Sequence, residues 1–101
     1  MSKTTKVTTM NVEWDSSKAS ANLGKHGVAF EDALHIFYDA GRIELHDGRE
    51  GYDEDRWATI GLVYPAVLYV VYTIRDGDSI RIISARKANG NEQKQYRQAN
   101  P

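Results

Sequence analysis

The sequence predicts an α+β fold in which a mostly antiparallel sheet carries helices packed on one face. Three observations lead to this prediction. Four strand-like segments follow one another between residues 42 and 87, short turns join the later ones, and helical segments flank them on both sides. Strands joined by short turns run antiparallel. The expected order of elements is βααββββα.

The first residues are expected to lie outside the folded part of the chain. Residues 1–9 are polar, rich in Thr and Lys, and lack a helical stripe of apolar residues, so they predict a flexible leader. The single domain then covers residues 10–101. Met10, where the structured part would begin, is an alternative start to Met1.

The first helix is expected after a short strand. Asp15 or Ser16 can cap its beginning, and Gly27 can end it after His26 because glycine readily adopts the left-handed conformation of a helix end. A second helix is predicted over residues 30–39, where acidic residues occupy the first turn and apolar residues recur at helical spacing.

The two sides of the first helix are expected to differ in polarity. Trp14, Ala19 and Leu23 would supply its apolar side. Lys18, Asn22 and either Lys25 or His26 recur at spacings of three and four and would share a polar side.

Turn residues separate the remaining strands. Asp76-Gly77-Asp78 has the composition of a hairpin turn. Pro65 separates the strand predicted at residues 56–63 from the strand predicted at residues 66–74. A short charged helix is expected over residues 91–98, with Asn89 or Asn91 as its cap. The strands are predicted at residues 11–14, 42–46, 56–63, 66–74 and 79–87.

Charge is strongly segregated along the chain, although the net charge is only -1. Residues 31–55 hold nine acidic residues against two arginines, whereas residues 56–101 hold seven basic residues against three acidic ones. Such separation can produce a basic face that suits an anionic partner. An ordinary patchy surface explains the charges equally well.

Several classes of protein are excluded by what the sequence lacks. Without cysteine there is no disulfide or thiolate zinc site, and a reducing, cytoplasmic location is expected. No apolar run approaches the roughly 20 residues that cross a bilayer, so no membrane association is expected. His26, His35 and His46 lack a metal-ligand spacing, and no P-loop or Rossmann motif occurs. The sequence therefore predicts neither a metal nor a cofactor.

The segment Ile80–Arg86 is the strongest candidate for a functional site. Arg86 follows the small residues Ser84 and Ala85, which leaves room for its guanidinium to grip a phosphate with two hydrogen bonds. Strict alternation places Arg81 on the opposite face, so both arginines can serve one site only if the strand bends or bulges. The alternative is a structural role over the sheet. Function is favoured for Arg86, and the two roles are balanced for Arg81.

Other side chains near this strand are weaker candidates. Arg56, Arg75 and Lys87 could contact phosphates, but the first two could equally pair with the acidic residues at positions 53–55. Tyr96 on the last helix could stack on a base or donate a proton, or it could simply pack against the sheet.

Lys25 and His26 form a second basic group at the end of the first helix. Histidine suits proton transfer near neutral pH, and Lys25 adds a fixed positive charge. The alternative is that His26 only caps the last carbonyls of the helix.

Short motifs recur in a definite order along most of the chain, from Met10 to Tyr96. In this order and spacing they resemble the BrnT family of bacterial toxins. The matching residues are Trp14-Asp15 with Lys18 and Asn22, Lys25-His26-Gly27-Val28, Phe30-Glu31-Asp32-Ala33 with Phe37 and Asp39, Asp55-Arg56 with Gly61, Val71-Tyr72-Thr73 with Arg75, Ile80-Arg81-Ile82-Ile83-Ser84-Ala85-Arg86-Lys87-Ala88, and Glu92 with Tyr96.

The resemblance implies a small RelE-like fold and an RNA-cleaving activity that arrests translation. It also implies neutralisation by a ribbon-helix-helix antitoxin of the BrnA type, with operator DNA bound only through the antitoxin. A 2:2 complex of toxin and antitoxin is the expected assembly. RNA supplies its own nucleophile, the 2′-hydroxyl, so a metal-independent endoribonuclease is the leading hypothesis.

In this hypothesis the arginines hold the RNA backbone. Arg86 and Arg75 would bind the scissile and flanking phosphates, and Arg56, Arg81 and Lys87 would be further substrate contacts.

Proton transfer is assigned to other residues. His26 would act as the base or acid, Lys25 would stabilise charge, and Tyr96 would donate a proton or stack on a base. The alternative function is a non-catalytic module that binds an antitoxin-like partner and, through it, DNA.

Overall fold

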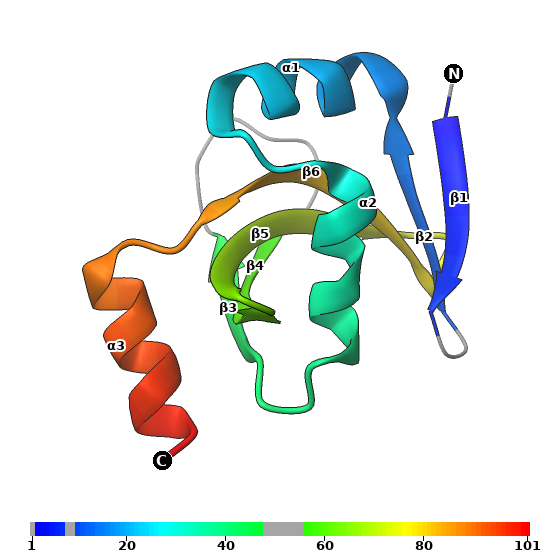
Figure 1. The fold of residues 1–101 in the computed structure, drawn as a ribbon. Coiled ribbons are helices and arrows are strands. Elements are labelled where there is room, and N and C mark those ends of the chain that lie inside the picture. The colour runs from blue at the N-terminus through cyan, green and yellow to red at the C-terminus, as the bar shows by residue number, and fades with distance from the viewer. Residues whose placement is uncertain (1, 8–9, 48–55) are drawn as a thin grey trace.

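A six-stranded sheet organises the part of the chain that the structure describes, residues 2–7, 10–47 and 56–101 of a computed structural model (Figure 1). The strand order is β1-β2-β6-β5-β4-β3. Neighbouring strands pair antiparallel except β2 and β6, which are parallel. The elements are β1 (Ser2–Val7), β2 (Met10–Asp15), α1 (Ser16–His26), α2 (Phe30–Ala33), the 3-10 helix η1 (Leu34–Tyr38), β3 (Ile43–Asp47), β4 (Arg56–Val63), β5 (Ala66–Arg75), β6 (Ser79–Lys87) and α3 (Gly90–Ala99).

Strand β1 replaces most of the flexible leader that was expected over residues 1–9. It pairs antiparallel with β2 along its whole length, from Ser2 opposite Asp15 to Val7 opposite Met10. The segment contains β-branched residues, which favour strands, and lysines, which suit an exposed sheet edge. Its polar composition therefore belongs to an edge strand.

Helix α1 has the bounds that its capping residues predict. The Asp15 carboxylate accepts a hydrogen bond from the backbone N–H of Lys18 at 3.0 Å, and Gly27 ends the helix with a φ of 71°. The helix expected over residues 30–39 is divided into α2 and η1. Among the described helices none is long and apolar enough to span a membrane.

The main core lies between the sheet and the segment formed by α2 and η1 (Figure 1). Trp14 and Phe30 are buried there, and their rings meet edge to face with 6.0 Å between centroids. Ile80 and Ile82 of β6 are buried in the same cluster. Each such side chain contributes roughly 1.5–3 kcal/mol on burial, so this cluster fixes one face of β6 against α2.

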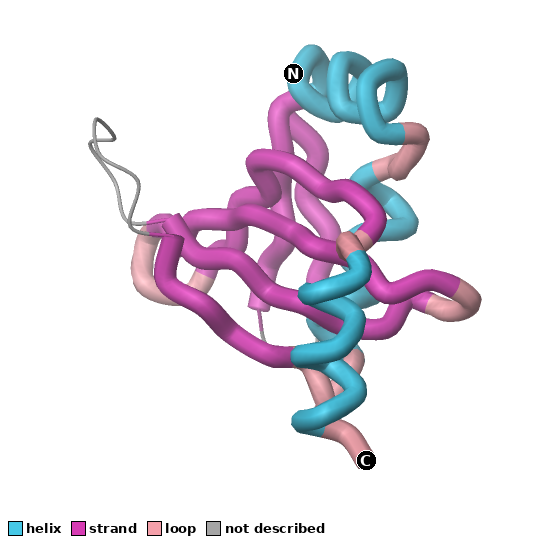
Figure 2. Tube along the Cα trace, turned by 90° about the vertical axis from the view of Figure 1, so that its left-hand side faces the viewer, coloured by secondary structure: helices cyan, strands magenta, loops and turns pink. Residues whose placement is uncertain are grey.

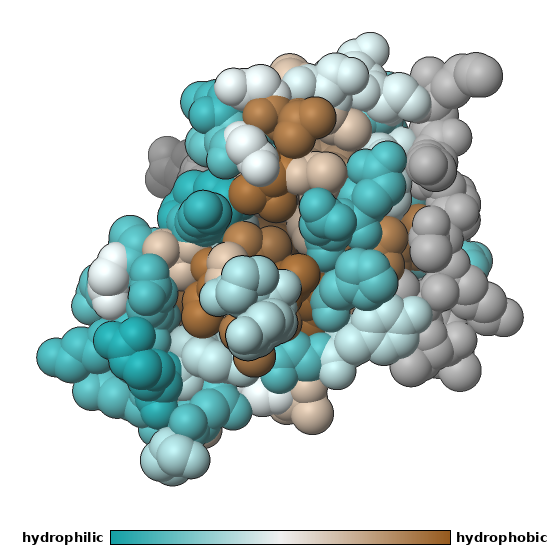
Figure 3. Space-filling view, in the orientation of Figure 1, coloured by the Kyte–Doolittle hydropathy of each residue, from teal (hydrophilic) through white to brown (hydrophobic). Residues whose placement is uncertain are grey.

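Helix α3 lies on the other side of the sheet from α2 (Figure 2). The prediction that the helices share one face is therefore wrong for α3. None of the ten residues of α3 is buried, and its surface is hydrophilic (Figure 3). The reason is that α3 has no apolar stripe to place on the core, so it docks through polar contacts.

Candidate active site

A β-bulge interrupts the alternation of side chains in β6. Tyr72 of β5 pairs with Ile82, whereas the preceding Val71 pairs with Ser84. Ile83 is therefore an extra residue in β6, with no direct partner in β5. Every residue after it changes face relative to a regular strand.

The bulge brings Arg81 and Arg86 to the same face. Direct partners in an antiparallel pair point to the same side of the sheet. Arg81 pairs with Thr73 and Arg86 with Tyr69, and these two β5 residues stand an even number of positions apart. Both arginines thus lie on the face away from the main core, as the sequence allowed only if the strand bulged.

A cavity of about 360 Å³ opens on this face. Its walls come from α1, β4, β5 and β6, so it joins the two basic segments that the sequence singled out. The lining residues are Lys25, His26, Arg56, Tyr69, Val71, Ile83, Ser84 and Arg86.

Asn22 fixes the end of α1 beside the cavity. Its Nδ2 donates to the carbonyl oxygens of Ala85 at 2.9 Å and Val28 at 3.0 Å, and its Oδ1 accepts from the backbone N–H of Ala85 at 3.1 Å. The side-chain amide thus pairs with both the N–H and the carbonyl of Ala85, as the backbone of a neighbouring strand would. Lys25 and His26 follow in the last turn of the same helix and are carried to the cavity.

The guanidinium of Arg86 is held by three neighbours. Its Nη1 and Nη2 donate to the two carboxylate oxygens of Glu92 at 2.8 and 2.9 Å, and Nη1 also donates to the carbonyl of Lys87 at 3.2 Å. Its Cζ lies 4.2 Å from the ring centroid of Tyr69. The hydrogen bond with Glu92 raises the pKa of Arg86 and lowers that of Glu92, so both stay charged at neutral pH.

Arg75 and Arg81 do not line the cavity. Arg81 forms an ion pair with Glu13 at 3.4 Å. Arg75 ends β5, six residues beyond Tyr69, a separation of roughly 20 Å along an extended strand. The acidic residues 53–55, which were considered as partners of Arg75 and Arg56, lie outside the described residues.

Tyr96 also lies away from the cavity lining. Its hydroxyl donates to Asp39 Oδ2 at 2.7 Å, and burial together with this bond raises the pKa of Tyr96 to about 12. Burial acts to raise the pKa of Asp39, but hydrogen bonds from Leu62, Tyr96 and Gly41 outweigh it and hold that pKa below its usual value. The phenol therefore remains protonated at neutral pH and ties α3 to the turn before β3.

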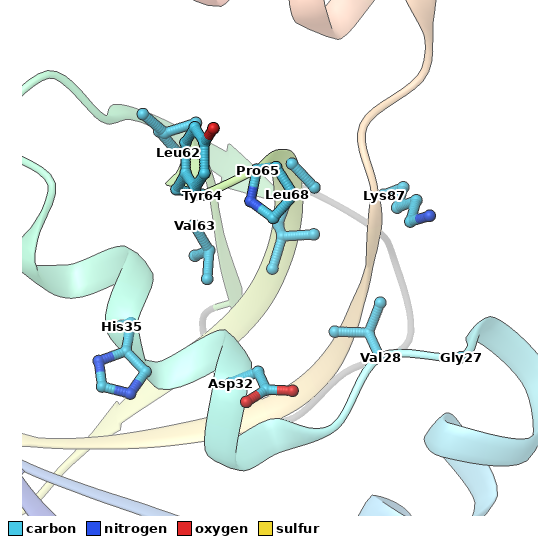
Figure 4. Close-up of a pocket in the computed structure, with 11 residues that line it drawn as sticks. Gly27, Val28, Asp32, His35, Leu62, Val63, Tyr64, Pro65, Leu68 and Lys87 are labelled. Carbon is cyan, nitrogen blue, oxygen red and sulfur yellow. The ribbon is translucent and has the colours of Figure 1, made fainter.

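Lys87 belongs to the opposite face of β6. It lies at the rim of a second cavity of about 570 Å³ near the β4–β5 turn. Its ammonium points away from Val28 and Leu68 (Figure 4). Lys87 therefore does not join Arg86, although it is the next residue in sequence.

Three residues near the cavity were not assigned to it from the sequence, namely Asn22, Tyr69 and Glu92. Glu92 follows Asn89 at the spacing of a capping box, and this signal could have placed it at the start of α3. The contact of Tyr69 with Arg86 depends on the strand register after the bulge, for which no local pattern exists. Within the described ranges no group of three or more potential metal-ligating side chains occurs.

Together, the fold and the cavity define a small α+β protein in which basic side chains from α1, β4 and β6 line one cavity. The description "Ribonuclease toxin, BrnT, of type II toxin-antitoxin system" belongs to the family model that matches residues 14–92. The chain belongs to this BrnT family of ribonuclease toxins. The resemblance seen in the sequence motifs is thus confirmed, and membership implies an antitoxin partner.

A solved structure supports the same assignment. The crystal structure of the Brucella abortus ribonuclease toxin BrnT is similar to this chain with a TM-score of 0.60 and 25% sequence identity, over 75% of this chain and 92% of that one. The expected α+β class is confirmed by this likeness. Among curated proteins no sequence matches the chain.

Proposed function

We propose that the protein cleaves RNA without a metal ion, at the cavity that holds Lys25, His26, Arg56 and Arg86. The observation that carries the proposal is the convergence of these four side chains from three different elements on one cavity. Family membership supplies the ribonuclease class of the activity. A cationic cavity is suited to the RNA backbone because phosphates dominate the affinity of proteins for nucleic acids.

RNA brings the nucleophile to this reaction. The 2′-oxygen attacks the adjacent phosphorus, the bond from phosphorus to the 5′-oxygen breaks, and a 2′,3′-cyclic phosphate and a 5′-hydroxyl result. One proton leaves the 2′-hydroxyl and one reaches the departing oxygen. The negative charge that grows on the phosphoryl oxygens requires fixed cations nearby.

The cavity residues divide these tasks. His26 exchanges one of the two protons, as base or acid, and water exchanges the other. Arg86 and Arg56 bind the scissile phosphate. Lys25 stabilises the developing charge from the end of α1. Arg75 contacts RNA farther along the same face, where flanking phosphates would run.

For the biological role we propose what the family resemblance implies. Cleavage of cellular RNA arrests translation, and a ribbon-helix-helix antitoxin of the BrnA type neutralises the toxin in a 2:2 complex that binds operator DNA through the antitoxin. Support comes from membership in a type II toxin–antitoxin family. Co-expression with the protein encoded next to this gene, followed by mass measurement of the complex, tests both the partner and the stoichiometry.

Cleavage of a defined RNA in excess chelator tests the catalytic proposal. Arg86→Ala is expected to lower kcat/KM by about 100-fold, in line with the loss of one donor to a developing anion. Arg97→Ala is the matched control, because it removes an exposed arginine of α3 outside the cavity. It should stay within about twofold of the wild type.

Two outcomes contradict the proposal. A folded wild-type protein that cleaves no RNA would favour the non-catalytic binding module. Activity that chelator abolishes and a divalent ion restores would show that a metal takes part.

A further inference from the structure

Glu92 links the start of α3 to the candidate site. Its Oε1 accepts from the backbone N–H of Asn89 at 2.9 Å as well as from Arg86, and its Oε2 accepts from Arg86 alone. Asn89 Oδ1 in turn accepts from the backbone N–H of Glu92 at 2.8 Å, which completes a capping box. The Glu92 side chain is only 13% exposed. One shielded carboxylate therefore fixes both the helix start and the arginine.

The hydrogen bonds of Arg86 use one end of its guanidinium. Both Nη1 hydrogens have acceptors, in Glu92 and the Lys87 carbonyl, and one Nη2 hydrogen is bound by Glu92. The Nε hydrogen and the second Nη2 hydrogen have no acceptor among the described residues. In a planar guanidinium these two lie side by side on one edge, and that edge can bind a phosphate with two parallel hydrogen bonds.

The orientation of the guanidinium is fixed in two ways. The Glu92 carboxylate sets its rotation within the plane, and the Tyr69 ring, 4.2 Å from Cζ, lies against the plane itself. The edge with the remaining donors is thus preorganised. A donor that needs no rearrangement contributes more to a transition state than a mobile one.

We propose that Glu92 is a positioning residue for RNA cleavage, which holds one end of Arg86 so that its Nε–Nη2 edge is presented to the scissile phosphate. The proposal rests on the function proposed above and deepens it. It assigns a role in the reaction to α3, a helix that contributes no residue to the cavity lining. Glu92 itself touches no substrate.

A purely structural role of the same ion pair is the competing explanation. In that case Arg86 would serve only to anchor α3. The helix has other attachments, because Tyr96 binds Asp39 at 2.7 Å and the Asn100 side chain donates to the Gly41 carbonyl at 2.8 Å. Docking of α3 is therefore not dependent on Arg86 alone.

Two substitutions separate the positioning role from the capping role. Glu92→Gln keeps an oxygen for the Asn89 N–H, since glutamine also serves in capping boxes, but it loses the charge and the second carboxylate oxygen for Arg86. Asn89→Ala removes the cap acceptor for Glu92 N–H and changes no atom that contacts Arg86. Steady-state cleavage and the thermal midpoint of unfolding are measured for both.

The two variants should diverge in activity. For Glu92→Gln we expect kcat to fall by about 10- to 100-fold with KM changed less than about threefold, because the loss falls on the transition state. For Asn89→Ala we expect a thermal midpoint at least as low as that of Glu92→Gln. Its kcat should stay within about twofold of the wild-type value. A kcat for Glu92→Gln close to that of the wild type overturns the proposal, and so does an equal loss in both variants.

The exchanged pair Arg86→Glu with Glu92→Arg gives an independent check. The double variant restores opposite charges, so its thermal midpoint should be higher than that of either single variant, while its cleavage activity should stay low. Recovered cleavage would show that the pair only anchors α3. Failure of the underlying function is recognised separately. An active Arg86→Ala variant rejects Arg86 as the phosphate ligand, while an inactive Arg86→Ala variant beside an active Glu92→Gln variant rejects only the positioning role.

Discussion

Arg86 and Tyr69 face each other directly across the β5–β6 pair, with the guanidinium carbon 4.2 Å from the ring centroid. This contact requires the bulge at Ile83, because a regular β6 would turn Arg86 toward the main core. The bulge therefore determines that Arg86, and not its neighbour Lys87, lines the cavity.

Replacement of Tyr69 by Leu should weaken cleavage modestly. The aromatic face that steadies Arg86 is lost, and a partly exposed cation–π contact contributes about 0.5–1 kcal/mol. We expect kcat/KM to fall by about two- to fivefold in a cleavage assay. Tyr69→Phe keeps the ring and should retain most of the activity. A Leu variant as active as the Phe variant would show that the ring face has no influence on the arginine.

Replacement of Asn22 by Ala should destabilise the protein strongly. Three hydrogen bonds to the backbone of Ala85 and Val28 are lost, and buried groups are left without partners. Such losses cost about 2–4 kcal/mol in the free energy of unfolding, which urea titration measures. Leu23→Ala is the neighbouring control, since that side chain is 50% exposed and should cost less than about 1 kcal/mol. Comparable losses in the two variants would contradict the role given to Asn22.

Tyr96 and Asp39 should be energetically coupled. Tyr96→Phe removes the hydroxyl that donates to the Asp39 carboxylate and should lower the free energy of unfolding by about 1–2 kcal/mol. In a double-mutant cycle with Asp39→Asn the coupling should be about 1 kcal/mol. Additive losses would mean that the two side chains contribute independently.

The contribution of Glu92 to stability should depend on pH. The hydrogen bond from Arg86 outweighs burial and holds the pKa of Glu92 below its usual value of 4.5. The unfolded chain therefore binds this proton more readily, so the stabilisation is fully present above pH 4.5 and is lost as pH falls through the lower folded pKa.

Urea titrations of the wild type and Glu92→Gln across this range measure that effect. The wild type should be more stable by up to about 1 kcal/mol near neutral pH, and the difference should shrink on acidification. Asp39 titrates in both proteins, so its own contribution cancels in the comparison. A difference that stays constant with pH would contradict the assignment.

Local signals in the sequence predicted most element bounds. Asp15 and Gly27 limit α1 because each acts on its own helix end through a short-range hydrogen bond or backbone conformation. The strands at residues 56–63 and 79–87 match their predicted ranges. The expectation of a leader before Met10 was wrong because strand β1 depends on pairing with β2, which its own polar composition does not reveal.

The candidate site was harder to predict because it depends on contacts between distant segments. Asn22 was expected on the polar side of its helix, yet it is buried through bonds to Ala85. Leu23, expected on the apolar side, is half exposed. Lys25, His26, Arg56 and Arg86 were all named as candidates from the sequence, but their position around one cavity depends on the bulge and on the Asn22 contact.

Helix α3 is attached to the sheet by hydrogen bonds and an ion pair, and none of its residues is buried. The heat-capacity change and the urea dependence of an opening reaction both grow with the surface it exposes. We therefore expect release of α3 to give a smaller calorimetric signal than melting of the sheet. Amide hydrogen exchange confined to residues 90–99 would reveal it. Such exchange would show that α3, beside the cavity, opens separately from the cooperative melting of the sheet.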